Sequence, residues 1–302
     1  NGGYHGELNY HNSFLIADKD EGWLLETAGK FWAAKRTEEI CTISNALTIN
    51  NNFDLIHQEA VKHAIEKKWC RSEDDFEFAK AYGDKIYTCF SGAKKRKERS
   101  EAFIKDESPD INPSTLMKLL KDHQYDKDIK RGSMKNICMH GGGLISSQTT
   151  ASIICEISEK TTVWATGTSA PCVSTYKPVW FTEKGSTLPY SKETEGMSYW
   201  RLWEELHRAY LFKSKGTKAY LKKTMEEFQN KLLQKAVETK DEQGKYSELT
   251  RFAYNESAKM AKKLSDEIKN EKNTMVSPIF WLYWNIQNAR MKSKKKSYAV
   301  KF

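Results

Sequence analysis

The sequence predicts an α+β fold in which blocks of β-strands and blocks of helices follow one another. Residues 12–49 and 144–180 contain short apolar runs separated by Gly and Asp, a pattern typical of antiparallel strands. Residues 54–131 and 196–270 instead carry apolar side chains at helical spacing. Because the two kinds of element are segregated along the chain, we expect layers of antiparallel sheet packed against helices.

The first block divides into four predicted strands, and each of the first three ends at a turn or a charged segment. The strands are residues 12–18, 23–27, 31–36 and 40–49. Glu26 lies inside an apolar strand, and a buried carboxylate needs a partner. Lys30 or Lys35 across the hairpin is the expected partner. The second block, 144–180, predicts a hairpin followed by an irregular segment that contains two prolines.

The helical blocks have recognisable starts and breaks. Residues 54–68 place apolar side chains on one helical face, and the Asn-Pro-Ser at 112–114 is a typical helix start. Three more helices are expected after residue 196, separated by 213–216 and 241–247. Their apolar stripes indicate core packing more often than a cofactor site.

Composition and charge narrow the possible classes. The chain has 302 residues, 12% of them aromatic, which argues for a globular protein with a substantial core. No apolar run reaches the roughly 18 residues of a membrane helix, so no transmembrane segment is expected. The net charge of +9 is concentrated at 94–99 and 291–301. Such runs can bind nucleic acid or an anionic membrane, but they lack a nucleic-acid-binding motif, so we expect a solvated loop and tail and no nucleic-acid partner.

Cysteine and histidine spacing gives no metal motif. The six cysteines form no CxxC pair and show no zinc-like spacing, which favours reduced thiols and a cytoplasmic location. His57 and His63 lie six residues apart, unlike the i, i+4 pair of a zinc helix. We therefore expect neither a metal nor another cofactor.

The stretch from Cys138 to Gly143, Cys-Met-His-Gly-Gly-Gly, allows three interpretations. Cys138 and His140 would point the same way in a strand, so a Cys–His pair is possible, but no third orienting group is identifiable. The glycines lack the Lys and Ser/Thr of a phosphate-binding loop. A turn that leads into the following strand is the preferred interpretation.

Three ordered blocks of the sequence carry a family resemblance. "NSFLIADKDEGWLLETAGKFWAAKR" with "CTISNALTI", then "SSQTTASIICEI" with "VWATGTSAPCVSTYKPVWF", then "YWRLWEELHRAY" resemble the secernins and the related C69 (formerly U34) dipeptidases. The resemblance covers roughly residues 1–212. It implies a four-layer αββα sandwich of the N-terminal-nucleophile hydrolase type, with a partial core over 1–180 and a helical region with a basic tail over 181–302.

The resemblance also implies an activity, which is hydrolysis of short peptides by an N-terminal Cys. In the family this Cys precedes the segment that aligns with Asn1, so we expect the N-terminal part of the sandwich and its nucleophile to be missing here. The expected partners are a short peptide substrate and either the missing N-terminal segment or a second copy of the chain. The alternative is a catalytically inactive interaction protein in secretion or trafficking.

Three residues are the candidates for substrate or oxyanion contacts. Asn45 matches an Asn that related hydrolases place near the nucleophile, although an Asn at a strand end often caps a turn. Gln148 and Thr149 enter a strand that resembles the inner sheet of the family, although their polar groups could equally bond to the backbone. No catalytic residue is expected within the chain.

Overall fold

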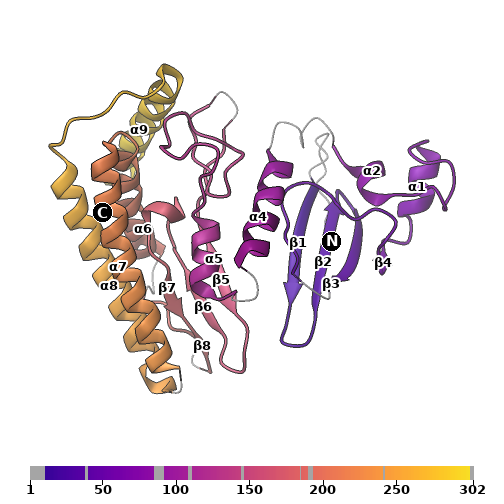
Figure 1. Cartoon of the computed structure of the whole chain (residues 1–302), viewed down its shortest axis with the longest axis horizontal. Helices are drawn as coiled ribbons and strands as arrows, with labels where there is room; N and C mark the ends of the chain where they lie inside the picture. Colours follow the sequence, from indigo (N-terminus) through magenta and orange to yellow (C-terminus); the bar gives the residue numbers. More distant parts are fainter. Residues whose placement is uncertain are drawn as a thin grey trace. The chain divides into compact units, whose positions relative to one another are not determined.

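A computed structural model describes residues 11–37, 40–84, 92–107, 111–143, 146–183, 185–189, 193–240 and 242–299, without the side chains of 193–197 and 292–299. The chain divides into two compact units, Asn1–Ser108 and Pro109–Phe302. Figure 1 labels their elements, and each unit is described by itself.

The first unit contains a four-stranded antiparallel sheet in the order β1-β2-β3-β4 (Figure 1). Its strands are β1 (His11–Ala17), β2 (Gly22–Ala28), β3 (Phe31–Thr37) and β4 (Leu55–Ile56), and its helices are α1 (Ala60–Glu66), α2 (Phe78–Tyr82) and α4 (Ala93–Glu107). The two hairpins place Glu26 opposite Ser13 on one side and Ala33 on the other. The three predicted strands between residues 12 and 36 are therefore confirmed.

The predicted fourth strand, 40–49, is wrong, because Glu26 binds the backbone that a strand would use. The carboxylate of Glu26 is buried and accepts hydrogen bonds from Thr48 N, Thr48 Oγ1 and Ile49 N at 2.7–2.9 Å. These N–H groups are thus unavailable for a sheet ladder. The expected partners are also wrong: Lys30 pairs with Glu59 at the surface.

Two further expectations for the first unit need correction. The helix predicted over 54–68 begins only at Ala60, because Leu55 and Ile56 pair with Ala34 and Ala33 of β3. The basic run 94–99 is not an exposed loop but part of α4. Lys95 and Lys97 in that helix pair with acids three or four residues later, which stabilises the helix.

The second unit combines a three-stranded antiparallel sheet with long helices (Figure 1). The sheet is β5 (Ile153–Glu156), β6 (Thr162–Ala165) and β7 (Lys177–Val179), and a small hairpin joins β8 (Phe181–Thr182) to β9 (Gly185–Ser186). The helices are α5 (Pro113–Leu120), α6 (Glu193–Tyr210), α7 (Lys215–Thr239), α8 (Tyr246–Ile268) and α9 (Pro278–Ala299), with 3-10 turns η1 (Pro171–Val173) and η2 (Gln243–Lys245).

Most expectations for this unit are confirmed. The hairpin β5–β6 and the three helices α6, α7 and α8 lie where the pattern predicts them. Asn112 caps α5 by accepting a hydrogen bond from Thr115 N, with Pro113 in the first turn. The apolar segment 278–286 forms the first part of α9, and it buries Phe280 and Trp284.

The core explains where the chain divides. Trp164 of β6 and Trp180, which follows β7, are buried with Leu232 of α7 and with Tyr246 and Leu249 of α8. The sheet over 144–180 thus shares its apolar core with the C-terminal helices. The structure therefore divides between residues 108 and 109, whereas the sequence placed the boundary between 180 and 181.

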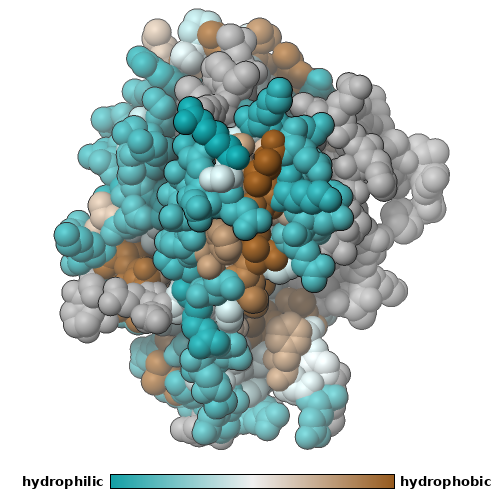
Figure 2. All heavy atoms as spheres, turned by 90° about the vertical axis from the view of Figure 1, so that its right-hand side faces the viewer, coloured by the Kyte–Doolittle hydropathy of each residue, from teal (hydrophilic) through white to brown (hydrophobic). Residues whose placement is uncertain are grey.

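The polarity of the surface and the composition of the helices bear on whether the chain can cross a membrane. Figure 2 shows one side of the chain, where hydrophilic residues surround a narrow apolar strip. Among the described helices, none combines the length and the apolar composition that a membrane crossing requires. The structure thus agrees with the sequence in the absence of a transmembrane segment from the part of the chain that it describes.

Candidate metal centre

Four side chains with metal-ligating atoms meet in the interior of the second unit. The ligand atoms all lie within 4.8 Å of one another, and the residues are His123, Cys138, His140 and Cys172, all buried. The Nε2 atom of His140 has three of these atoms around it: His123 Nε2 at 3.0 Å, Cys138 Sγ at 3.6 Å and Cys172 Sγ at 3.3 Å. One imidazole nitrogen carries one proton or one lone pair, so it can satisfy only one of three neighbours by hydrogen bonding.

These three distances fit the edges that meet at one ligand atom of a tetrahedron around a metal ion. With Zn–N near 2.0–2.1 Å and Zn–S near 2.3 Å, a tetrahedron has N–N edges of about 3.3 Å and S–N edges of about 3.6 Å. The observed N–N distance of 3.0 Å and S–N distances of 3.3 and 3.6 Å differ from these by about 0.3 Å or less. Two thiolates and two imidazoles are the ligands of many structural zinc sites.

Local backbone bonds bring His123 and Cys138 together. His123 follows the C-terminal end of α5, and Cys138 N donates to the carbonyl oxygen of Asp122 at 3.2 Å. The loop between them is closed by Asp126, whose carboxylate accepts hydrogen bonds from the backbone of residues 130–132. A loop with these internal bonds holds both ligands in place without secondary structure of its own.

Cys172 reaches the group from the 3-10 turn η1. The turn starts after Ala170, which is fully buried and has a φ of 53° in the left-handed region. An alanine in this region costs of order 1–3 kcal/mol, so the surrounding contacts must hold it there. One of these contacts is the bond from Ala170 N to the carbonyl oxygen of Thr149, at 2.9 Å.

A second layer of buried groups orients His140. Its Nδ1 lies 3.1 Å from His207 Nε2, and His207 Nδ1 lies 3.3 Å from Glu204 Oε2. If His140 Nε2 binds a metal, its Nδ1 carries the proton and donates to His207, which in turn donates to Glu204. Ser169 Oγ and Arg208 Nε, the latter at 2.6 Å, also donate to Glu204. Every proton in this series of hydrogen bonds, from His140 through His207 to Glu204, then has an acceptor.

The electrostatics of the group favour one thiolate even without an ion. Burial alone would raise the pKa of Cys172, but the Cys138 thiol, His123 and His140 lower that pKa well below its usual range. Burial and the hydrogen bond to Cys172 raise the pKa of Cys138. Burial lowers the pKa of His140 to about 4, so its ring is neutral near pH 7, as a metal ligand must be.

Burial would likewise raise the pKa of Glu204, but its bonds to His207, Ser169 and Arg208 lower the pKa to about 2. Glu204 is therefore an ionised carboxylate at neutral pH. A carboxylate at the end of a chain of imidazoles strengthens the basicity of the metal-binding nitrogen.

Two of the three glycines after His140, Gly141 and Gly142, allow α9 to approach the site. A Cβ atom on Gly142 would lie 2.1 Å from the Phe280 ring, and one on Gly141 would lie 2.7 Å from the Tyr283 hydroxyl. Trp284 of α9 donates from Nε1 to the Gly141 carbonyl oxygen at 3.0 Å. The glycine run is needed for close packing, and the strand that follows, β5, starts only at Ile153.

Two of the predicted site residues lie beside this group, in positioning contacts. Gln148 Oε1 accepts from Gly141 N at 3.0 Å, and Thr149 Oγ1 accepts from Met139 N at 2.9 Å. Thr149 therefore links the segment of His140 to the turn of Cys172 through its bond to Ala170. Both residues are committed to backbone groups, which is the alternative that the sequence left open for them.

Asn45 lies in the first unit, in a bend rather than at a strand end. Its Oδ1 accepts from Arg96 Nη2 at 2.8 Å, and its carbonyl oxygen lies 2.6 Å from His11 Nε2. Arg96 is buried in α4, so this contact ties the bend to the helix. The structure thus gives Asn45 internal partners in its own unit.

The sequence predicted no metal-binding role for His123, Cys172, Glu204 or His207. The expectation that the chain binds no metal came from the absence of zinc-like cysteine spacing and from His57 and His63, which are not part of the group. The available signal was Cys138-x-His140, two ligands on alternate residues. His123 and Cys172 carry no spacing that connects them to this pair.

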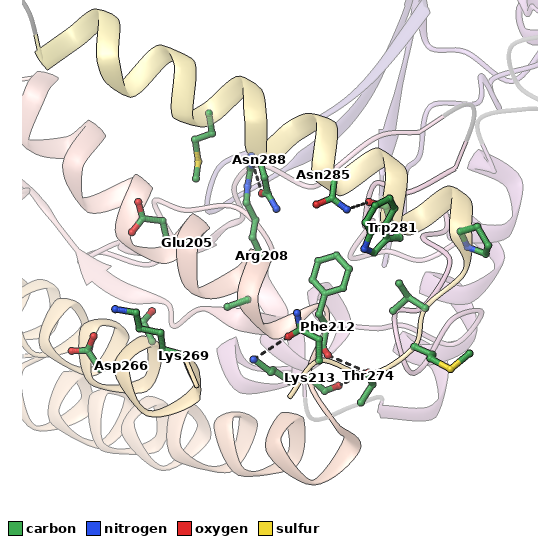
Figure 3. A pocket seen from close by; sticks show the side chains of 17 residues that line it. Glu205, Arg208, Phe212, Lys213, Asp266, Lys269, Thr274, Trp281, Asn285 and Asn288 are labelled. Carbon is green, nitrogen blue, oxygen red and sulfur yellow. Dashed lines mark hydrogen bonds between the residues drawn. The ribbon is translucent and has the colours of Figure 1, made fainter. Parts of the chain in front are cut away.

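Two cavities are lined by described residues of the second unit. A cavity of about 940 Å³ lies between α6, the segment after α8, and α9. Arg208 and Asn288 line it (Figure 3), and the guanidinium of Arg208 donates to Asn288 Oδ1 at 3.0 Å. Lys213 Nζ donates to Asn273 Oδ1, which also lies in the lining. Arg208 also binds Glu204, so this cavity contacts the outer end of the His140–His207–Glu204 chain. Another cavity, of about 400 Å³, has Cys172 among its lining residues.

Comparisons with known proteins do not assign this arrangement. A scan against protein-family models finds no match to the chain, and no solved structure matches it.

Proposed function

We propose that the chain is a zinc-binding protein whose second unit folds around a Cys2His2 centre made by His123, Cys138, His140 and Cys172. The observation that carries the proposal is the convergence of three ligand atoms on His140 Nε2 at 3.0–3.6 Å, which a shared ion satisfies and hydrogen bonds do not. The mixture of two thiolates and two imidazoles favours Zn²⁺ among the common divalent ions.

The geometry supports a metal centre better than a Cys–His pair for nucleophilic catalysis. Such a pair uses one thiol and one imidazole, with a third group that orients the base. Here a second thiol and a second imidazole lie as close to His140 as the first thiol does. Four protein ligands leave no open coordination position, so the proposed role of the ion is structural.

Metal analysis tests the proposal directly. Protein purified under reducing conditions should contain about one zinc per chain, and Co²⁺ exchanged into the site should give the absorption of a tetrahedral ion with thiolate ligands. Cys138→Ser should lose the ion, whereas Cys155→Ser, which changes an exposed cysteine of the same unit, should keep it. A reduced wild-type chain that neither contains nor takes up a metal ion would refute the proposal.

We also propose, from the resemblance of the three sequence blocks, that the chain belongs to a secernin-like cysteine dipeptidase of the N-terminal-nucleophile type. The antiparallel hairpins at 11–37 and 153–165, inside the resembling blocks, support it. In this proposal the nucleophilic Cys lies outside the 302 residues, the substrates are short peptides, and the compartment is the cytoplasm. An inactive interaction protein in secretion or trafficking is the alternative.

A reconstitution experiment separates these two possibilities. The chain joined to an upstream family segment with an exposed N-terminal Cys should hydrolyse dipeptides, and Cys→Ala at that position should abolish the activity. Absence of activity toward any short peptide, in a fusion that is folded and zinc-loaded, would favour the interaction protein.

A further inference from the structure

The cavity of about 400 Å³ in the second unit lies between two helices that face each other across Cys172. One wall is formed by α5 and the residue just after it, at the helical spacing 114, 117, 118 and 121, and the other by α7 at 222, 225, 226, 229 and 230. Met117 and Met225 are the apolar part of the lining. A volume in this range is typical of sites for small molecules.

The charge of the lining is unbalanced toward the positive. Three lysines, Lys118, Lys121 and Lys222, contribute to it, against one acid, Glu226. The proposed metal centre shares Cys172 with this lining. It does not change the charge balance, because its two thiolates neutralise the charge of Zn²⁺. The cavity therefore keeps an excess of cations that attracts an anion.

Lys121 is the cation placed to bind such an anion. It is half-buried, and its ammonium lies 5.5 Å from the centre of the Tyr176 ring. Within the described part of the chain, no carboxylate pairs with it and no oxygen accepts a hydrogen bond from it. A half-buried ammonium without an acceptor is stabilised by a ligand oxygen.

We propose that this cavity binds a small organic anion, whose carboxylate or phosphate pairs with Lys121 beside the sulfur of Cys172. The inference deepens the proposed zinc centre and rests on it, since the ion neutralises Cys172 and leaves Lys121 to the ligand. Ser114 and Asn230 at the rim offer further polar groups, whereas Gln229 already binds the backbone of Tyr176 through both side-chain atoms. The ligand lies next to the metal centre without entering its coordination sphere.

Calorimetric titration of the zinc-loaded chain tests the proposal. The probes are inorganic phosphate, glycylglycine with its free carboxylate, and N-acetylglycinamide as a neutral control. At least one anion should bind and the neutral probe should not, and the anion that binds identifies the ligand group. Removal of a charge-assisted bond in Lys121→Gln should weaken binding by about ten- to hundredfold. The matched control is Lys223→Gln on α7, whose side chain is 78% exposed and does not line the cavity; it should change binding less than about twofold.

The outcomes separate this proposal from that of the metal centre. A shift of the thiolate-to-Co²⁺ absorption upon anion binding supports the position beside Cys172. A chain that holds zinc but binds neither anion overturns the anion site alone, as does equal binding to wild type and a folded Lys121→Gln. A chain without zinc that still binds an anion through Lys121 overturns the metal centre, and with it the proposed position of the anion beside a zinc-bound Cys172. If Lys121→Gln does not fold, the wild type alone tests the anion site: binding of an anion but not of the neutral probe supports the site, and equal binding of both overturns it.

Discussion

Each unit contains a group of histidines, half-buried in the first unit and buried in the second, and the two groups differ in where the ring nitrogens point. In the first unit His57 and His63 lie against the ring of Phe31, at centroid distances of 5.3 and 4.4 Å. Their nitrogens have separate partners: His57 Nδ1 accepts from Glu59 N, and His63 Nδ1 meets the Tyr82 hydroxyl. In the second unit the nitrogens of His123 and His140 point at each other and at two sulfurs.

This difference shows that composition alone does not make a metal site. The first group uses imidazole as a flat, partly apolar ring that packs against aromatic faces. The second group uses imidazole as a donor of one lone pair toward a common point. The other nitrogen of His140 is fixed by His207. We therefore expect metal-dependent behaviour from one unit only, and the following predictions test that contrast.

The largest effect is expected when a ligand of the second group is removed. His140→Ala should lose the ion and lower the free energy of unfolding of the second unit by more than about 4 kcal/mol, because metal binding is coupled to folding. His63→Ala should leave the zinc content unchanged and cost about 1–2 kcal/mol in the first unit, from lost stacking and one hydrogen bond. Hydrogen exchange measured by mass spectrometry reads each unit separately. Equal destabilisation of both units by His140→Ala would contradict the contrast.

The sequence predicted the elements of both units better than it predicted either histidine group. Strands over 12–36 and helices after residue 196 follow from local alternation and local helical spacing, which a sequence displays directly. The strand expected over 40–49 is absent, and at its end a distant carboxylate, Glu26, takes the N–H groups of Thr48 and Ile49. The metal centre escaped for the same kind of reason, since His123 and Cys172 join Cys138 and His140 only through the tertiary fold.

A second contrast concerns buried cations and pH. Lys218 in the second unit is buried and donates to the Asp128 carbonyl oxygen at 2.8 Å, whereas Lys30 in the first unit is exposed and pairs with Glu59. Burial lowers the pKa of Lys218 to about 8. The unfolded chain keeps this proton up to about pH 10.4, so between pH 8 and that value the unfolded state binds more protons. Stability of the second unit should therefore rise over this window as pH rises.

The size of this rise is about 2–3 kcal/mol for Lys218 alone. Lys218→Met, which has no titrating group, should flatten the rise when urea unfolding is followed between pH 8 and 10. Lys30→Met in the first unit is the matched control and should leave the slope as it is. A slope that persists in Lys218→Met would assign the effect to other groups.

Substitution of a residue that orients the metal ligands should have an intermediate effect on zinc affinity. Glu204→Gln keeps the shape of the side chain but removes the charge that faces His207 and Arg208. We expect zinc affinity to fall by about 10- to 100-fold, as for other outer partners of ligating histidines. Competition with a fluorescent chelator measures this affinity. Glu205→Gln, the exposed neighbour on α6, is the control and should not change it. An unchanged affinity in Glu204→Gln would show that the chain of imidazoles does not support the site.

The smallest effect is expected at the residues that the family resemblance selected. Thr149→Val removes the oxygen that accepts from Met139 N, so it should cost about 1 kcal/mol in the second unit and weaken zinc binding only slightly. Asn45→Ala should cost a similar amount in the first unit, through the lost bond from Arg96, without any change in zinc. In a fusion with dipeptidase activity, a positioning role predicts that Thr149→Val lowers stability with KM unchanged. A raised KM at unchanged stability would instead identify Thr149 as a substrate contact, as the resemblance predicts, because only a residue that touches the peptide alters its affinity without loosening the fold.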